Sequence, residues 1–442
     1  MSISKEELME EARSRNVKFV RLQFVDILGT LKNVAITIEQ LPRALDGEIM
    51  FDGSSIEGFS RIQESDMYLK PDRETFTVFP WDTGEGCVAR LMCDIYTPEG
   101  EPFAGCPRMT LKKVIEECNE MGYSMNAGPE PEFFLFKLNE DGEPTTKTHD
   151  RGGYFDLSPV DKGEAARRDI AIALERMDFE VETSHHEVAS GQHEIDFKHN
   201  PVLRTADNIA TFEFVTKKIA RQHGLHATFM PKPIEGINGS GMHVHQSLSR
   251  NGDNIFYDPE DERDLSQEVY HYIGGLLKYA PEYTAITNPT INSYKRLIPG
   301  YEAPVYISWS TCNRSALVRV PASRGAGTRV ELRNPDPSSN PYLAMAVTLK
   351  AGLEGIKQGI SPGEETRENI YSMDRQKREE NGITSLPGSI KEAVSNLEGS
   401  EMMREALGDH IFNKFIRAKK LEWDDYKKQV HRWELDRYLL NY

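Results

Sequence analysis

The chain has 442 residues, which allows one large α/β unit beside a smaller one, or about three domains of ordinary size. With 53 basic and 70 acidic side chains its formal net charge is −17, which disfavours a nucleic-acid partner because acidic surfaces repel the phosphate backbone. Charges interrupt every stretch long enough to span a bilayer, and the five cysteines include no Cys-x-x-Cys pair, so we expect a cytoplasmic protein with reduced thiols and no membrane contact.

The first hundred residues combine one helix with short strands. Amphipathic spacing predicts a helix over 4–15, and alternating stretches predict strands over 18–25 and 33–38. A cluster of Pro and Gly without apolar periodicity then follows between Tyr96 and Pro107. We therefore place a domain boundary there and expect one domain over 1–103 and a second over 104–442.

Helical and strand-like patterns alternate through the second domain. Helix spacing occurs at 110–121, 163–177, 205–223, 265–279, 341–357 and 399–418. Strand-like runs occur at 131–138, 226–230, 242–247, 305–309 and 329–333. The last segment, 433–442, ends in an apolar tip, and because such a tip needs a partner surface we expect an oligomer.

Two carboxylates stand immediately before an apolar strand. Glu130 and Glu132 are separated by Pro131, and the two-residue period of a strand puts both on one face. A solvated surface pair is the simpler interpretation of one such motif, since carboxylates are mostly exposed. Further segments of the same kind favour a functional cluster over a solvated surface pair.

Three other segments add polar groups at strand spacing. Glu187 and Glu194 bracket a glycine turn, His243-Val244-His245 follows Asn238-Gly239-Ser240-Gly241, and 329–333 reads Arg-Val-Glu-Leu-Arg. Each segment alone is weak evidence, but together they supply five carboxylates, two histidines and two arginines. Oxygen ligands with an occasional imidazole suit Mg²⁺ or Mn²⁺, so we expect a paired divalent site that supports phosphoryl transfer from a nucleoside triphosphate.

Arginines are concentrated late in this acidic chain. They are Arg296, Arg314, Arg319, Arg324, Arg329 and Arg333. A solvated basic patch is the simpler interpretation, but Arg314 and Arg319 stand in strand-like apolar context, where an unpaired guanidinium would be costly. No phosphate-binding Gly-x-x-x-x-Gly-Lys-[Ser/Thr] loop and no dinucleotide fingerprint is present. Phosphate binding must therefore rely on metal ions and arginines. Cys312 stands beside Asn313 and Arg314 without a helper base, which disfavours a nucleophilic role.

These motifs, in this order, resemble the bacterial type I glutamine synthetases over essentially the whole chain. The matching segments are 51–56, 130–134, 232–233, 238–245, 299–304, 313–315 and 329–337. The resemblance implies an α+β fold, with a small N-terminal β-grasp-like domain followed by a catalytic domain whose curved antiparallel sheet is flanked by helices. It also implies ATP-dependent ligation of ammonia to glutamate through γ-glutamyl phosphate, in central nitrogen assimilation.

The resemblance also assigns roles, each carried to the matching position of this sequence. The metal ligands, for two or more Mg²⁺ or Mn²⁺ ions, are Glu132, Glu187 and Glu194 at one site and Glu130, His243 and Glu331 at the other. Glutamate is held by Asn238, Gly239, Arg296, Glu302 and Arg333, and ATP by His185, His245, Ser247, Arg314, Arg319 and Arg329. Ammonium is bound by Asp52 of a neighbouring subunit with Tyr154, Glu187 and Glu302; the catalytic residues are Asp52, Glu302 and Arg314.

The chemistry of the reaction requires residues of these types. A carboxylate resists nucleophilic attack, so it is first phosphorylated, and phosphate then becomes the leaving group. Ammonium lacks a lone pair at neutral pH and needs carboxylates that attract it and accept its proton, a role that suits Asp52 and Glu302. Because water would destroy the acyl phosphate, we expect the loop over 299–302 to act as a closing flap.

Some positions depart from subgroups of that family. His199 stands where some relatives have an aromatic residue that stacks on adenine. Tyr371 aligns with a tyrosine that one subgroup adenylylates, but its surroundings lack that subgroup's pattern, and an extra insertion is missing. The chain resembles instead the shorter subgroup that is inhibited by its product, for which Arg61 is the matching sensor residue. The family further implies a homododecamer of two stacked hexameric rings with active sites between neighbours, and nitrogen-responsive transcription regulators as partners.

Three alternatives remain. A related enzyme could join glutamate to an organic amine, although Asp52 and Tyr154 favour a small cation. A two-metal phosphohydrolase would leave the glutamate segment and the flap unexplained. A catalytically silent binding protein is disfavoured because every metal position and Glu302 are present.

Overall fold

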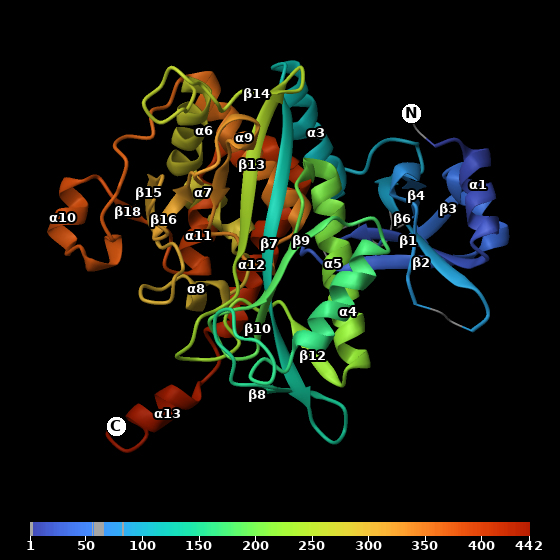
Figure 1. Cartoon of the computed structure of the whole chain (residues 1–442), viewed down its shortest axis with the longest axis horizontal. Helices are drawn as coiled ribbons and strands as arrows, with labels where there is room; N and C mark the ends of the chain where they lie inside the picture. The colour runs from blue at the N-terminus through green and yellow to red at the C-terminus, as the bar shows by residue number, and fades with distance from the viewer. Residues whose placement is uncertain (1–2, 55, 57–65, 82–83) are drawn as a thin grey trace.

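The computed structural model describes residues 3–54, 56, 66–81 and 84–442. Two separate sheets organise the chain, a six-stranded one near the N-terminus and a twelve-stranded one in the remainder. Figure 1 shows the N-terminal part at one side of the large sheet and the C-terminal helix projecting away from the rest of the molecule. None of the described helices is both long and apolar enough to cross a membrane.

The N-terminal sheet has the order β2-β1-β6-β4-β3, with β5 paired to β6. Its central pair, β1 and β6, is parallel and the other pairs are antiparallel, which is the β-grasp arrangement. The helix predicted over 4–15 is confirmed as α1. It begins after Ser4 because Ser4 and Glu7 form a capping box there. The elements are α1 (Lys5–Ser14), β1 (Val17–Val25), β2 (Leu31–Thr37), α2 (Leu41–Leu45), β3 (Ile49–Asp52), β4 (Asp66–Pro71), β5 (Thr77–Val78) and β6 (Cys87–Tyr96).

The large sheet has the order β18-β15-β16-β17-β13-β7-β10-β9; β8, β11 and β12 also pair with β7, and β14 pairs with β13. The expected antiparallel pairing holds except between β15 and β16, which are parallel. Its strands are β7 (Ser124–Leu138), β8 (Pro144–Thr148), β9 (Val181–His186), β10 (Gln192–Phe197), β11 (Asn200–Pro201), β12 (Leu225–Thr228), β13 (Met242–Arg250), β14 (Asp253–Asn254), β15 (Tyr306–Ser310), β16 (Ala316–Arg319), β17 (Val330–Leu332) and β18 (Thr384–Ser385).

Helices cover one face of this sheet (Figure 1). The α-helices of this part of the chain are α3 (Pro107–Glu120), α4 (Glu164–Glu175), α5 (Val202–Gln222), α6 (Gln267–Lys278), α7 (Ala280–Thr287), α8 (Ser293–Arg296), α9 (Pro341–Gln358), α10 (Arg375–Glu380), α11 (Ile390–Glu398), α12 (Glu401–Tyr426) and α13 (Arg432–Tyr438); α13 projects away from the sheet. The six helices predicted in this region are confirmed as α3, α4, α5, α6, α9 and α12, with ends that shift by a few residues. The helix predicted over 399–418 extends further, to Tyr426, and has a kink at Gly408, whose φ is +74°.

The helix α9 lies at the centre of the helical layer, against α3, α5, α6, α7 and α12. It approaches α6 so closely that a Cβ on Gly275 would lie 2.1 Å from the carbonyl oxygen of Ala351. A Cβ on Gly355 would lie 2.1 Å from the carbonyl oxygen of His271. Glycine is therefore required on both helices at this contact.

Alternation along the central strands separates the core from the other face of the sheet. Phe133, Val244, Ile195 and Leu332 are buried in the main hydrophobic core. Each of them has at least one charged residue or histidine next to it in the chain, which a period of two turns to the opposite face: Glu132, His243, His245, Glu194, Asp196, Glu331 and Arg333. The fold thus gathers charged side chains on the face that the helices leave open.

Candidate functional site

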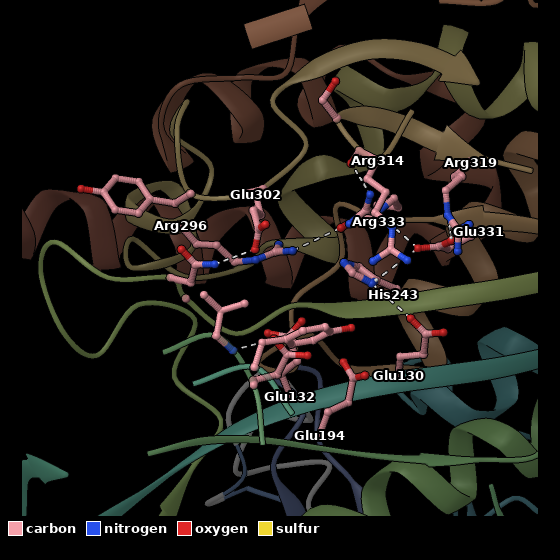
Figure 2. Close-up of a pocket in the computed structure, with 18 of the residues that line it drawn as sticks. Glu130, Glu132, Glu194, His243, Arg296, Glu302, Arg314, Arg319, Glu331 and Arg333 are labelled. Atoms are coloured by element: carbon pink, nitrogen blue, oxygen red, sulfur yellow. Dashed lines mark hydrogen bonds and ion pairs between the residues drawn. The ribbon is translucent and has the colours of Figure 1, made fainter. Parts of the chain in front are cut away.

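A cavity of about 750 Å³ lies on this open face. Glu130, Glu132, Tyr154, His185, Glu187, Gln192, Glu194, Asp196, Asn238, Gly239, His243, Arg296, Tyr301, Glu302, Cys312, Asn313, Arg314, Arg319, Glu331, Arg333, Arg367, Asn369 and Tyr371 are among the residues that line it. Figure 2 shows the carboxylates of β7 and β10 on one side and the arginines on the other.

Strand register brings the acidic motifs together. Glu132 on β7 faces Glu194 on β10, and Glu130 on β7 faces His243 on β13. On the far side of β13, His245 faces Glu331 of β17. Segments separated by up to two hundred residues in the sequence therefore meet across four adjacent strands.

Glu130, His243 and Glu331 form one group whose ligand atoms lie within 4.8 Å of one another. His243 Nδ1 lies 3.2 Å from Glu130 Oε2 and 3.6 Å from Glu331 Oε1. Burial alone would raise the pKa of Glu130, but hydrogen bonds with His243 and His245 outweigh it and hold this pKa well below its ordinary value. Glu130 is therefore a carboxylate at neutral pH, as a cation ligand must be.

The proton on His245 can be placed from its neighbours. Arg329 Nε donates to Nδ1 of His245 at 3.1 Å, so Nδ1 must carry a lone pair. The proton then resides on Nε2, which donates to Glu130 Oε1 at 2.6 Å. His245 thus links Arg329 to a carboxylate of the first group.

Glu187, Glu194 and His185 form a second group with ligand atoms within 4.8 Å of one another. His185 Nε2 lies 3.1 Å from Glu194 Oε1. Burial first, then repulsion from Glu187 and Glu194, raises the pKa of Glu132 well above its ordinary value, and burial with nearby carboxylates does the same for Glu194. Crowded carboxylates of this kind need positive charge, and their donor set suits Mg²⁺ or Mn²⁺.

Arginines form the opposite wall. Arg333 Nε lies 3.2 Å from Glu331 Oε1, and Arg319 also pairs with Glu331. Arg296 is buried, and its guanidinium donates to the backbone carbonyls of Arg333 and Asn334. Arg314 is exposed to the cavity. A substrate between these walls meets cation-binding groups on one side and fixed positive charge on the other.

The loop over 299–302 closes one end of the cavity. Glu302 has a left-handed backbone, with φ of +57°, and its Oε2 accepts a 2.8 Å hydrogen bond from Asn238 Nδ2. Lys232 Nζ lies 3.8 Å from the ring centroid of Tyr301. Two contacts therefore hold this loop against the segment around Asn238.

Glu365 holds the segment that presents Arg314. Its Oε1 accepts a 2.8 Å hydrogen bond from the backbone N–H of Thr311, and its Oε2 lies 3.3 Å from Arg263 Nε and 3.1 Å from Arg367 Nε. Although burial acts against it, hydrogen bonds from Thr311 and Arg367 lower the pKa of Glu365 to about 2.

A second cavity, of about 380 Å³, adjoins the first and shares Glu130 and Asp196 with it. His199, His245, Ser247 and Arg329 line this second cavity. Burial raises the pKa of Asp196 to about 7 against the opposing hydrogen bond from Thr183. The two compartments meet at the carboxylates, which is suitable for a ligand whose charged end reaches the first cavity.

The predicted metal and glutamate residues all line the first cavity, as do Tyr154, Arg314 and Arg319. His185, which stays a prediction for ATP, lies beside Glu187 and Glu194 of the second group. Asp52 ends β3 and lines neither cavity of its own chain. Arg61 lies outside the described residues. Cys312, expected to be structural, is exposed and lines the cavity.

Sequence reasoning missed Gln192, Asp196, Arg367 and Asn369. Asp196 could have been found, because it repeats the alternation of Glu194 on the same strand face. Arg367 and Asn369 stand in a loop whose sequence shows no periodicity, and only the fold brings them to the cavity.

Another cluster, of His149, Asp150, Asp161 and His193, is buried away from the cavity and also has the spacing of cation ligands. Arg167 Nη1 already lies 2.9 Å from Asp161 Oδ2 and 2.9 Å from His193 Nδ1. Its guanidinium supplies the positive charge there, and we interpret the cluster as structural.

Comparison with known proteins agrees with this geometry. The model of the "Glutamine synthetase, catalytic domain" family matches residues 104–438, and that of the "Glutamine synthetase, beta-Grasp domain" family matches residues 16–98. The chain is 58% identical to a glutamine synthetase of Clostridium saccharobutylicum, over 99% of each chain, and 57% identical to one of Thermus thermophilus, over 100% of each.

Solved structures give the same result. A structure titled "GmaS/ADP complex-Conformation 1" has a TM-score of 0.89 and 31% identity, covering 98% of this chain and 99% of that one. A cryoEM structure of Plasmodium falciparum glutamine synthetase has a TM-score of 0.87 and 27% identity, covering 99% of both chains.

Proposed function

The chain belongs to the glutamine synthetase family and is an ATP-dependent glutamate–ammonia ligase, and we propose that glutamine forms in the larger cavity through γ-glutamyl phosphate. One observation carries the assignment of the site: carboxylates and a histidine from β7, β10, β13 and β17 meet in one cavity that five arginines also line. The residue roles below extend this proposal.

The donors fit divalent cations. Glu130, His243 and Glu331 would hold one ion, and Glu132, Glu187 and Glu194 another, with His185 beside them. The raised pKa values of Glu132 and Glu194 reflect burial and mutual repulsion that a cation relieves. When bound, Mg²⁺ or Mn²⁺ supplies charge neutralisation for the triphosphate.

The smaller cavity is our candidate for the nucleoside part of ATP, with Ser247 and His245 in its wall and Arg329 beside the phosphates. Arg296, Arg333, Asn238 and Gly239 would hold glutamate so that its γ-carboxylate oxygen attacks the terminal phosphorus and the bond to ADP breaks. Arg314 and Arg319 would offset the negative charge that develops on the transferred group.

In the second step ammonia attacks the acyl phosphate carbon and phosphate leaves. Glu302 would accept a proton from ammonium, a role supported by its position at the cavity and its hydrogen bond from Asn238. The loop that carries Glu302 would keep water away from the acyl phosphate. Asp52, Tyr154 and Glu187 would complete the cation pocket.

Because Asp52 lines neither cavity of its own chain, we propose that it serves the site of a neighbouring subunit in a homododecamer of two stacked hexamers. The exposed C-terminal segment, in which Leu440 is 96% and Tyr442 101% exposed, would insert into the opposite ring. Deletion of residues 433–442 should separate the rings in analytical ultracentrifugation, whereas an intact double ring would contradict this role.

We further propose the product-inhibited, non-adenylylated subgroup. Tyr371 lines the cavity, and its hydroxyl donates to the carbonyl oxygen of Ala303. An adenylyl group on this hydroxyl would therefore break that contact and displace the proposed flap. Glutamine should inhibit the enzyme, and Arg61→Ala should relieve that inhibition; unchanged inhibition would refute the assignment of Arg61.

We also propose the domain bounds, the cellular location and one class of protein partner. The family models meet between residues 98 and 104, which supports domains over 1–103 and 104–442. The five unpaired cysteines support a cytoplasmic location. Nitrogen-responsive transcription regulators as partners are proposed from the family alone.

The decisive test is glutamine formation from glutamate, ATP and ammonium with Mg²⁺ or Mn²⁺, comparing the wild type with Glu132→Ala and Asp52→Ala. Methylamine and polyamines in place of ammonium test the organic-amine alternative, which the 54–58% identity to glutamine synthetases disfavours. Phosphate release without glutamate would instead support a phosphohydrolase.

A further inference from the structure

Gln192 is a buried amide at the junction of the metal and glutamate subsites. It begins β10 and is 1% exposed. Strand alternation puts its side chain on the same face as Glu194, and β10 pairs with β7 through Gln192 and Phe134. A polar side chain so deeply buried needs partners for every donor and acceptor.

All of those groups have partners. Nε2 donates to Glu132 Oε2 at 2.7 Å and to the carbonyl oxygen of Gly239 at 3.0 Å, which uses both amide hydrogens. Oε1 accepts from the backbone N–H of Ala189 at 3.3 Å. The orientation of the amide is thereby fixed, because rotating it by 180° would place the carbonyl oxygen against a carboxylate and another carbonyl.

On the metal side, Gln192 orients Glu132. Oε2 of Glu132 accepts from Gln192 and also from the backbone N–H of Gly241, at 3.0 Å. With both hydrogen bonds on Oε2, Oε1 is left for a cation. The backbone of Gln192 reaches the other metal carboxylate as well, since its carbonyl accepts a 2.8 Å hydrogen bond from the N–H of Glu187.

On the glutamate side, Gln192 holds Gly239. A Cβ on Gly239 would lie 2.2 Å from the carbonyl oxygen of Pro231, so only glycine allows this close approach of the two backbone segments. Asn238, its neighbour, bonds to Glu302. A shift of Glu132 toward a cation therefore pulls, through one amide group, on the segment that would hold glutamate.

We propose that Gln192 is a positioning residue that couples divalent-metal binding at Glu132 to glutamate binding at Asn238 and Gly239. This inference rests on the proposed function. Binding of each ligand sets the amide in the position that the other ligand requires. By linkage the effect is reciprocal: glutamate tightens metal binding by the same factor as metal tightens glutamate binding.

The test measures this coupling factor rather than turnover. Calorimetric titration of Mn²⁺ into the intact protein, with and without saturating glutamate, gives the factor directly. We expect at least about fivefold coupling in the wild type, the lower end for allosteric pairs. Gln192→Met keeps the volume but removes both donors, and should reduce the factor about threefold or more. Gln23→Met, a buried glutamine of β1 that is 2% exposed, is the matched control and should leave it unchanged.

If Gln192 had only a structural role, Gln192→Met would lower the melting temperature and weaken the binding of both ligands, but the coupling factor would not change. That result would overturn the proposal. So would a wild type that binds both ligands without coupling. Should Gln192→Met fail to fold, Gln192→Asn retains the amide but withdraws it by one methylene, and should show the same loss of coupling. A wild type that binds neither ligand would contradict the proposed function itself, so the two failures are distinguishable.

Discussion

Asn238 Nδ2 and Glu302 Oε2 are 2.8 Å apart, so the loop carrying Glu302 is tied directly to the segment proposed to hold glutamate. One hydrogen bond therefore links the loop over 299–302 to the proposed glutamate-binding segment. Glu302 also has a φ of +57°, a conformation that costs a non-glycine residue on the order of 1 kcal/mol and persists only where neighbouring contacts hold it.

Replacing Glu302 by Ala should uncouple the two chemical steps. The first step would continue, but ammonium would lose its proton acceptor and the acyl phosphate would lose its protection from water. We expect glutamine formation to fall about 100-fold or more, typical for loss of a general base. Phosphate release should fall much less, so the ratio of phosphate to glutamine should rise above one in a paired assay. A ratio that stays at one would contradict the flap role.

Metal binding should release protons. Burial, together with repulsion from nearby carboxylates, raises the pKa values of Glu132, Glu187 and Glu194, so these groups hold protons to higher pH than ordinary glutamates do. A cation displaces those protons, and metal affinity should therefore increase as pH rises. Calorimetry of Mn²⁺ binding in two buffers of different ionisation enthalpy measures the release; Glu132→Gln should reduce it.

Glu365→Gln should destabilise the protein in a pH-dependent way. The pKa of Glu365 is lowered to about 2 from an ordinary value of 4.5, so its stabilising contribution is complete above 4.5 and is lost as pH falls through 2. Removing its charge should cost about 1–3 kcal/mol near pH 7, the scale of charge-assisted hydrogen bonds. The difference in melting temperature between variant and wild type should narrow between pH 5 and pH 3. A constant difference would mean that the charge is unimportant.

Gly275→Ala should disrupt the contact between α6 and α9. The added methyl group would meet the Ala351 carbonyl, and overpacking of this kind costs about 1–3 kcal/mol. Gly399→Ala is the control, because its nearest neighbours are 3.7 Å away and its φ is −81°. Chemical denaturation should separate the two variants, and equal stability would show that the helices can move apart.

The sequence predicted individual helices and strands better than the long-range contacts between them. The alternation at Glu130 and Glu132 indicated a shared face, and β7 confirms it. The pairing of Glu132 with Glu194 depends on β10 lying beside β7, a long-range contact that local periodicity does not specify. The pairing of His185 with Glu194 depends in the same way on the β9–β10 register. Gln192 carried no signal at all, since an isolated glutamine gains meaning only from what surrounds it.

Asp52 stands on the N-terminal sheet, apart from the carboxylates that it is proposed to serve. Two defective proteins should then repair one another: Asp52→Ala keeps the carboxylate cluster, and Glu132→Ala keeps the missing aspartate. Dissociated, mixed in equal amounts and reassembled at random, they should recover about one quarter of wild-type activity, because one interface in four joins two undamaged halves. In a cell that makes both variants, the activity of each site would therefore depend on which two subunits form its interface.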